Sequence, residues 1–278
     1  MIPKMDYIVT TQRAAPVLME TINSIRKQSN VNQIVVMVGM GYDIPTFQVC
    51  ADIMKGMDSR FMMSLGGALQ ARLEAIKGYG STDYIVLVDD DVILKDNWIE
   101  EVWKFNDGNS ALGGVVPFNA RHEKIFKRIK EPILRTKGSA RTSNTLIRKE
   151  WFDDIDFNLR PVSVWGVDEN TWFLNHLMKK GIKFYTVPVL SRHSKKLPVT
   201  PIKTGIRMAA RWHRMGRYPT WKGMLKHIIG NLVGAFKASF KTRDCYYIVK
   251  MSKNAIGYFI GYGWWHKYYK KYDYSCKF

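Results

Sequence analysis

The fold is most clearly indicated by the stretch Tyr84-Ile85-Val86-Leu87-Val88-Asp89-Asp90-Asp91. Its first five residues are apolar or β-branched and predict a buried strand. The three carboxylates that follow repel one another, which indicates a positive group beside them, most simply a divalent cation with oxygen ligands. The carboxyl ends of strands in α/β sheets are also where nucleotides bind. The stretch therefore predicts a metal and nucleotide site at one edge of such a sheet.

Strand and helix patterns alternate through the first 199 residues. Apolar, β-branched runs predict strands, whereas apolar residues three and four apart predict helices. The alternation predicts an α/β fold with a mixed, mostly parallel sheet and helices on both faces. The expected strands are 7–10, 33–38, 84–88, 112–116 and 182–189, and the expected helices are 16–27, 69–76, 98–105 and 168–180.

The formal charge of +19 is concentrated in the last part of the chain. From Thr200 to Phe278 the sequence holds 16 Lys or Arg residues and 2 acidic residues, a net charge of +14. Apolar residues between Lys222 and Lys241 recur at helical spacing, and Trp and Tyr residues interleaved with lysines follow. We therefore predict two domains, an α/β domain over 1–197 and a basic, aromatic-rich, amphipathic helical extension over 198–278.

Three roles for this extension stay open from its composition. Basic amphipathic helices with Trp and Tyr suit the surface of an anionic membrane. Basic residues among aromatic ones also suit nucleic acid, through phosphate contacts and base stacking. The third role is a helical cover with a solvated basic face. We expect the anionic membrane surface, with nucleic acid as the weaker alternative.

The three cysteines, Cys50, Cys245 and Cys276, lie far apart and show neither a disulfide framework nor zinc spacing. This usage predicts a reducing, cytoplasmic setting. No charged segment followed by an apolar one is found near the N-terminus, so we expect no signal peptide. The longest apolar run of the tail, 255–265, is shorter than the roughly 20 residues of a membrane span. We expect a cytoplasmic protein that is peripheral at the inner face of the membrane.

Over about residues 5–196 the chain resembles the family-2 glycosyltransferases, whose nucleotide-sugar-binding fold is called GT-A (Rossmann-like). The resemblance rests on the order of several motifs more than on any single one. In sequence they are Ile8-Val9-Thr10-Thr11-Gln12-Arg13, Gly67-Ala68-Leu69-Gln70-Ala71-Arg72, Val88-Asp89-Asp90-Asp91, Trp165-Gly166-Val167-Asp168-Glu169-Asn170 and the single His193.

The resemblance implies a donor site and a metal site. The residues it implies for binding the nucleotide sugar are Thr10, Arg13, Arg72, Asp89 and Asp90. It places Mn²⁺ or Mg²⁺ at Asp89, Asp91 and His193, and carboxylate, water and phosphate oxygens suit both ions. The other interpretation of the aspartates is a solvated acidic turn, with Asp90 as a helix cap or facing water. Arg72 and His193 have the alternatives of a solvated helix arginine and a surface histidine.

The resemblance also implies a general base, which falls on Asp168, with Glu169 as its rival. Trp165, Gly166 and Glu169 would then bind the acceptor. Asp168 has a second interpretation as the N-cap of a helix, since aspartate is favoured there. Trp165 has the alternative of a core residue.

One departure from the family concerns the second strand, which normally ends in aspartates that read the base of the donor. Here it continues as Met37-Val38-Gly39-Met40-Gly41-Tyr42-Asp43, so either Asp43 replaces those aspartates or backbone groups read the base. The donor is therefore left open as a UDP- or GDP-linked sugar.

The sequence as a whole predicts an inverting, metal-dependent glycosyltransferase that moves a sugar onto a lipid-linked or polysaccharide acceptor. Direct attack on the anomeric carbon opposite the diphosphate inverts its configuration, as in family 2. The alternatives are a nucleic-acid-binding protein, a two-metal nucleic-acid enzyme, and an inactive GT-A scaffold at the membrane. A nucleotidyltransferase of related fold is disfavoured. Such enzymes have a glycine-rich N-terminal loop with an arginine and a lysine, which residues 7–13 do not supply.

Overall fold

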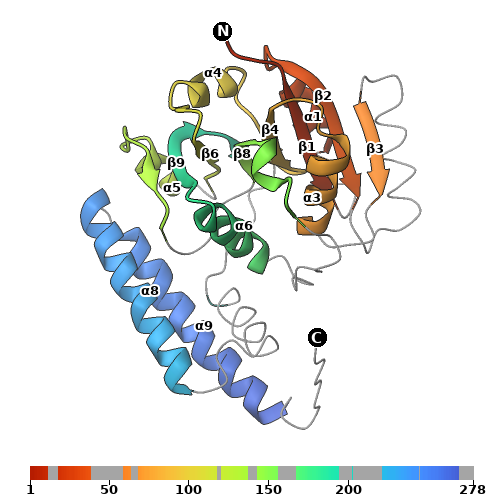
Figure 1. The fold of residues 1–278 in the computed structure, drawn as a ribbon. Coiled ribbons are helices and arrows are strands. Elements are labelled where there is room, and N and C mark those ends of the chain that lie inside the picture. Colours follow the sequence, from red (N-terminus) through yellow and green to blue (C-terminus); the bar gives the residue numbers. More distant parts are fainter. Residues whose placement is uncertain are drawn as a thin grey trace. The chain divides into compact units, whose positions relative to one another are not determined.

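The computed structural model describes residues 1–11, 18–38, 59–63, 68–117, 120–136, 143–155, 167–193, 202, 221–243 and 245–268 of the chain. They belong to two compact units, Met1–Lys196 and Leu197–Phe278. Figure 1 shows the strands and helices of both units.

The first unit is built on an eight-stranded sheet with the order β3-β2-β1-β4-β8-β6-β9-β7. Strands β3, β2, β1 and β4 are parallel neighbours, as are β6 and β9, whereas β8 is antiparallel to both β4 and β6. The strands are β1 (Met5–Thr11), β2 (Val31–Val38), β3 (Ser59–Met63), β4 (Tyr84–Asp89), β6 (Ser110–Val115), β7 (Ile133–Leu134), β8 (Asn144–Arg148) and β9 (Lys183–Leu190). A separate two-stranded pair joins β5 (Val92–Ile93) to β10 (Arg192–His193).

Alternation of side chains along each strand supplies a hydrophobic core on both faces of the sheet. In β4, Val86 and Val88 belong to one core cluster, while Ile85 and Leu87 belong to the other. Because both faces are buried, the strand is a continuous apolar run, as expected for a central parallel strand. The apolar stretch in the sequence is therefore explained by helices that cover both sides.

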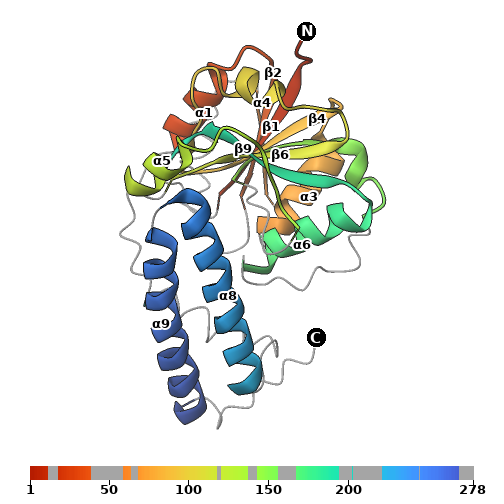
Figure 2. The same ribbon diagram turned by 90° about the vertical axis from the view of Figure 1, so that its left-hand side faces the viewer.

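Helices cover both faces of the sheet, as Figure 2 shows. Helices α1 (Leu18–Arg26) and α4 (Trp98–Trp103) pack on one face, and α3 (Ala68–Tyr79) and α6 (Val167–Lys179) pack on the other. The unit also contains α5 (Ala120–Phe126) and the 3-10 turn η1 (Lys149–Phe152). Gly181 follows α6 with a φ of 74°, the left-handed conformation that commonly ends a helix.

The structure confirms the predicted strands and helices of this unit in kind, with small shifts of their ends. The predicted alternation missed β3, β8 and the pair of β5 with β10. These strands are two to five residues long, too short for their periodicity to be distinctive. Their positions depend on the neighbours with which they pair.

The second unit contains two long helices, α8 (Trp221–Thr242) and α9 (Tyr246–Tyr268), which pack against each other. The predicted helix over 222–241 is confirmed as α8, whereas α9 was not predicted. Between them Met224, Ile228, Ala255 and Tyr258 form a buried cluster. No helix within the described ranges combines the length and apolar character that crossing a membrane requires.

Candidate active site

The parallel pairing of β1 with β4 brings polar residues together at the carboxyl edge of the sheet. Thr10 lies opposite Asp89 in the register of the two strands. Thr10 and the following Thr11 are buried, whereas Asp89 is partly exposed. The end of β1 therefore lies directly beside the first of the three aspartates.

Asp90 is held inward by two threonines. The Thr11 hydroxyl donates to Asp90 Oδ2 at 2.6 Å, and the Thr21 hydroxyl of α1 donates to the Asp90 carbonyl oxygen at 3.0 Å. Burial and the neighbouring carboxylates of Asp91 and Asp89 raise the pKa of Asp90 to about 6, although the Thr11 hydrogen bond opposes this shift. Burial is the main cause of the raised pKa, and the neighbouring carboxylates add to it.

Asp91 lies beside His193, which comes from a distant part of the chain. Antiparallel pairing of β5 with β10 places His193 opposite Val92, the residue after Asp91. His193 Nε2 is 3.4 Å from Asp91 Oδ2, and both side chains are largely buried. The other ring nitrogen, Nδ1, is buried with no hydrogen-bond partner among the described residues. The short strand pair therefore builds a carboxylate–imidazole pair at the sheet edge.

Asp89 is engaged by an arginine from α3. The Arg72 guanidinium donates to Asp89 Oδ1 and forms an ion pair with it. Arg72 is only 4% exposed, whereas Asp89 is 38% exposed. Such an ion pair fixes the direction of the carboxylate and leaves its open side toward solvent.

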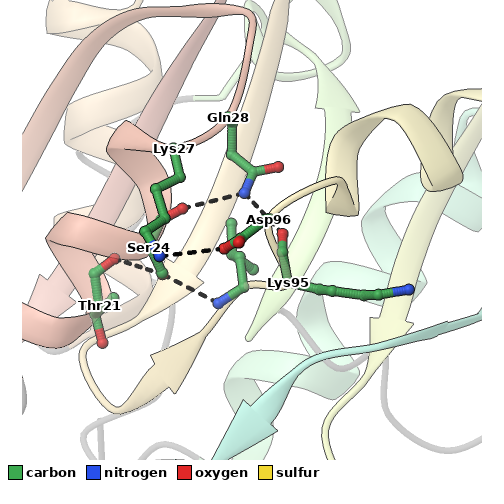
Figure 3. A network of polar contacts seen from close by, with 7 residues as sticks. Thr21, Ser24, Lys27, Gln28, Lys95 and Asp96 are labelled. Carbon is green, nitrogen blue, oxygen red and sulfur yellow. Dashed lines mark hydrogen bonds and ion pairs between the residues drawn. The ribbon is translucent and has the colours of Figure 1, made fainter.

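Helix α1 supports the segment that follows the aspartates through hydrogen bonds to its backbone (Figure 3). The Ser24 hydroxyl accepts from the Leu94 N–H at 3.0 Å. The buried Gln28 amide donates to the Lys95 carbonyl at 2.8 Å and accepts from the Ile99 N–H at 3.2 Å. Together with Thr21, these side chains hold the backbone from Asp90 onward against α1, so the aspartate turn rests on a rigid element.

Asp91 and His193 together suit a divalent cation by the chemistry of their donor atoms. One carboxylate and one imidazole are ligands that Mn²⁺ accepts, and phosphate oxygens and water commonly complete the shell of such ions. In the described part of the chain, no group of three His, Cys, Asp or Glu side chains is arranged to hold a metal. Within the described residues, Asp91 and His193 are therefore at most part of a metal-ligand set.

The remaining predicted site residues are seen in part or not at all. Asp168 and Glu169 lie in the first turn of α6, of which the backbone is described. Arg13, Trp165 and Gly166 lie outside the described residues.

Sequence reasoning assigned no role to Thr11, Thr21 or β8. Thr11 ends a strand parallel to β4, so the adjacency of strand ends was the signal that pointed to it. Thr21 had no such signal, because its contact depends on how α1 packs. At the start of β8, the Ser143 carbonyl accepts from the Asp89 N–H at 3.0 Å. The buried Asn144 amide donates to Ser191 at 2.8 Å.

No protein-family model and no curated protein sequence match the chain. Among solved structures, the chain is similar to the crystal structure of GalNAc-T7 with UDP, GalNAc and Mn²⁺. The TM-score is 0.52 and the identity 14%, with 70% of this chain and 44% of that chain covered. The chain thus spans less than half the length of that protein. At this identity the likeness concerns the fold alone.

The fold is of the GT-A (Rossmann-like) class, with a mixed, mostly parallel sheet and flanking helices, as the sequence predicted. Membership of family 2 within this class stays a prediction.

Proposed function

We propose that the chain is a metal-dependent glycosyltransferase that uses a nucleotide-sugar donor. The observation that carries this proposal is the pair of Asp91 and His193 at the carboxyl edge of a GT-A-like sheet. The similar structure named above contains UDP, GalNAc and Mn²⁺. Nucleotides bind at this edge of α/β sheets, so the pair lies where a donor diphosphate would bind.

In this proposal Asp91 and His193 hold Mn²⁺ or Mg²⁺, with Asp89 close by. The ion, when bound, neutralises the charge that develops on the departing diphosphate. The partly buried Asp90 adds negative charge beside the ion and is held by Thr11.

The donor would lie along the ends of β1 and β4. Thr10 and Arg13 would line the nucleotide, and Asp89 would accept hydrogen bonds from ribose hydroxyls. Arg72 would position Asp89 for that contact through their ion pair. The base of the donor, uracil or guanine, is a matter for the experiment below.

The acceptor would bind near the start of α6. Asp168 would take the proton of the acceptor hydroxyl as general base, and Trp165, Gly166 and Glu169 would contact the acceptor. Attack from the side opposite the diphosphate would invert the anomeric carbon. By its resemblance to family 2, the enzyme would act on a lipid-linked or polysaccharide acceptor.

Calorimetric titration tests the donor and metal assignments. UDP and GDP are each titrated into the full chain with and without Mn²⁺. The same titrations are repeated on Asp91→Asn and on Asp96→Asn. Asp96 is a matched control, because it lies in the same segment but is exposed and pairs only loosely with Lys27, at 3.5 Å.

We expect Mn²⁺-dependent binding of one nucleotide, weakened about 100-fold or more by Asp91→Asn and unchanged by Asp96→Asn. Equal binding with and without Mn²⁺, or equal loss in both variants, would contradict the metal assignment. Binding of neither nucleotide would instead favour an inactive scaffold of the same fold.

A further inference from the structure

Helix α8 carries two apolar faces, of which one is buried and the other is largely exposed. Met224, Ile228, Ala235 and Ser239 are buried. A second row recurs every third or fourth residue and is exposed to between 46% and 83%. Its members are Trp221, Leu225, Ile229, Val233, Phe236 and Phe240.

This arrangement differs from the single apolar face that the sequence suggested. Leu225, Ile229 and Phe236 belong to the exposed row, whereas Ile228 and the partly buried Leu232 belong to the cluster shared with α9. Ordinary surface helices have one apolar stripe, directed at the core. The second row lies outside the buried cluster that joins the two helices.

The exposed row continues onto α9. The Trp221 ring stacks on Phe259 with centroids 5.9 Å apart and an interplanar angle of 23°. Phe259 is 42% exposed, so the contact joins apolar surface on both helices. The row on α8 spans 20 residues from Trp221 to Phe240, and the 19 steps between them correspond to roughly 28 Å of helix. Contiguous apolar surface of this extent marks an interaction site.

Positive charge accompanies the apolar row. Residues 221–268 contain eight Lys or Arg residues and one acidic residue, Asp244. On α8, Lys222, Lys226 and Lys237 are exposed. Successive helical residues are rotated by about 100°, so these lysines lie next to the apolar row, on the side of the helix opposite the buried face. Long lysine side chains in this position can reach the headgroups while the apolar row is immersed.

We propose that the exposed row of α8, together with Phe259, inserts into the headgroup region of an anionic phospholipid bilayer. The lysines then lie at the lipid phosphates. Apolar burial supplies the insertion, and the charge supplies the preference for anionic lipid. Nucleic acid fits less well, because aliphatic residues such as Leu225, Ile229 and Val233 offer no flat ring for stacking on bases.

Vesicle flotation of the full chain tests this proposal without reference to sugar transfer. The vesicles are an equal mixture of phosphatidylglycerol and phosphatidylcholine, or phosphatidylcholine alone. The main variant is Phe236→Ser with Phe240→Ser, and the matched control is Leu134→Ser. Leu134 is a 44% exposed apolar residue of β7, outside the two helices.

We expect the wild type to bind the anionic vesicles and the double serine variant to bind at least about tenfold more weakly. Leu134→Ser is expected to bind as the wild type does. Lys222→Ala with Lys226→Ala should weaken binding to anionic vesicles and leave the weak binding to phosphatidylcholine unchanged. Because these residues are exposed, every variant should keep the melting temperature of the wild type.

Absence of vesicle binding by the wild type, or equal weakening by Leu134→Ser, would overturn the proposal. If the wild type does not bind vesicles and the serine variant has a different molar mass from the wild type in light scattering, the row instead contacts a second copy of the chain. If the wild type does not bind vesicles and the serine variant melts at a lower temperature than the wild type, the row instead packs against another part of the same chain. Salt-sensitive binding of single-stranded RNA in place of vesicles would overturn it as well.

Discussion

The two ends of the β1–β4 strand pair both carry carboxylates, but the surroundings of these carboxylates differ: Asp6 is buried, whereas Asp89, Asp90 and Asp91 are partly exposed. At the amino end, Asp6 is fully buried and accepts hydrogen bonds from the Ser81 and Thr82 N–H groups and from the Asn32 amide. At the carboxyl end, the contacts seen among the described residues include an ion pair of Asp89 with Arg72, a hydrogen bond from Thr11 to Asp90 and the approach of His193 to Asp91.

The pKa values of the two ends move in opposite directions. Burial raises the pKa of Asp6, but the hydrogen bonds from Asn32, Ser81, Gln33 and Thr82 outweigh it and hold the pKa below its usual range. At the carboxyl end, burial and like charge prevail and raise the pKa of Asp90 to about 6. Backbone donors therefore stabilise the ionised form of Asp6, whereas burial and neighbouring carboxylates disfavour the ionised form of Asp90.

The largest effect on stability is expected for Asp6→Asn. An amide lacks the charge that the Ser81 and Thr82 N–H groups and the Asn32 side chain now share. The loss should lower the free energy of unfolding by about 3 kcal/mol, measured by urea unfolding. Binding of Mn²⁺ and nucleotide by the folded protein should be unchanged. Asp83→Asn, an exposed residue at the same end, should leave stability unchanged. Equal destabilisation by both variants would remove the distinction.

The converse result is expected for His193→Ala at the carboxyl end. Removing the imidazole should weaken Mn²⁺-dependent nucleotide binding about 10- to 100-fold, because one metal ligand is lost. The free energy of unfolding should change little. Arg192→Ala is the control, since Arg192 is 75% exposed and lies beside His193 in β10. Unchanged binding in His193→Ala, measured by the same calorimetric titration, would place the metal elsewhere.

A smaller effect is expected from pH in metal-free buffer with a chelator. Because its folded pKa is lowered, Asp6 contributes stability above its unfolded pKa of about 3.9 and loses it as the pH falls through the folded pKa. Asp90 acts oppositely, because its folded pKa of about 6 makes its ionisation unfavourable to the fold. Relative to Asp90→Asn, the wild type should therefore lose stability as the pH rises from about 4 to about 6.

Urea unfolding of both proteins across this pH range measures the difference. Above the folded pKa the difference should become constant. If the difference in the free energy of unfolding between the two proteins does not change between these pH values, ionisation of Asp90 does not destabilise the fold, and the contrast with Asp6 is lost.

The smallest effect is expected for Lys27→Ala. The ion pair of Lys27 with Asp96 is 3.5 Å long and its side chains are 63% and 78% exposed. Its loss should change the free energy of unfolding by less than about 0.5 kcal/mol. Gln28→Met, one residue further on, removes buried hydrogen bonds to the Lys95 and Ile99 backbone and should cost about 2 kcal/mol. Similar values in thermal or urea unfolding would show that the support from α1 does not depend on burial.

Much of the sheet could be predicted from local patterns. The runs that became β1, β2, β4 and β9 are apolar and β-branched, and the position of the aspartates after β4 follows directly from the sequence. Helices α6 and α8 were predictable from residues recurring three and four apart. The two-layer cover of the sheet followed from the alternation of these elements.

Helix α9 and strand β8 could not be predicted in the same way. The sequence of α9 holds aromatic residues and glycines, which have low helix propensity, so its helical form depends on packing against α8. Strand β8 is five residues long and lies between β4 and β6 with the opposite direction. Such short strands form only where neighbouring edges are available for pairing.

The sequence by itself determined that this protein has an α/β sheet with three aspartates at the end of a central strand, followed by a basic helical part. These features depend on residues that are close in the chain, so the spacing of apolar and polar residues is enough to predict them. Only the tertiary structure decided which side chains meet those aspartates. His193 reaches Asp91 across 102 residues through the β5–β10 pair, and Arg72 reaches Asp89 from α3. It also divided the apolar residues of α8 between a buried and an exposed face, because burial depends on which neighbour covers each side.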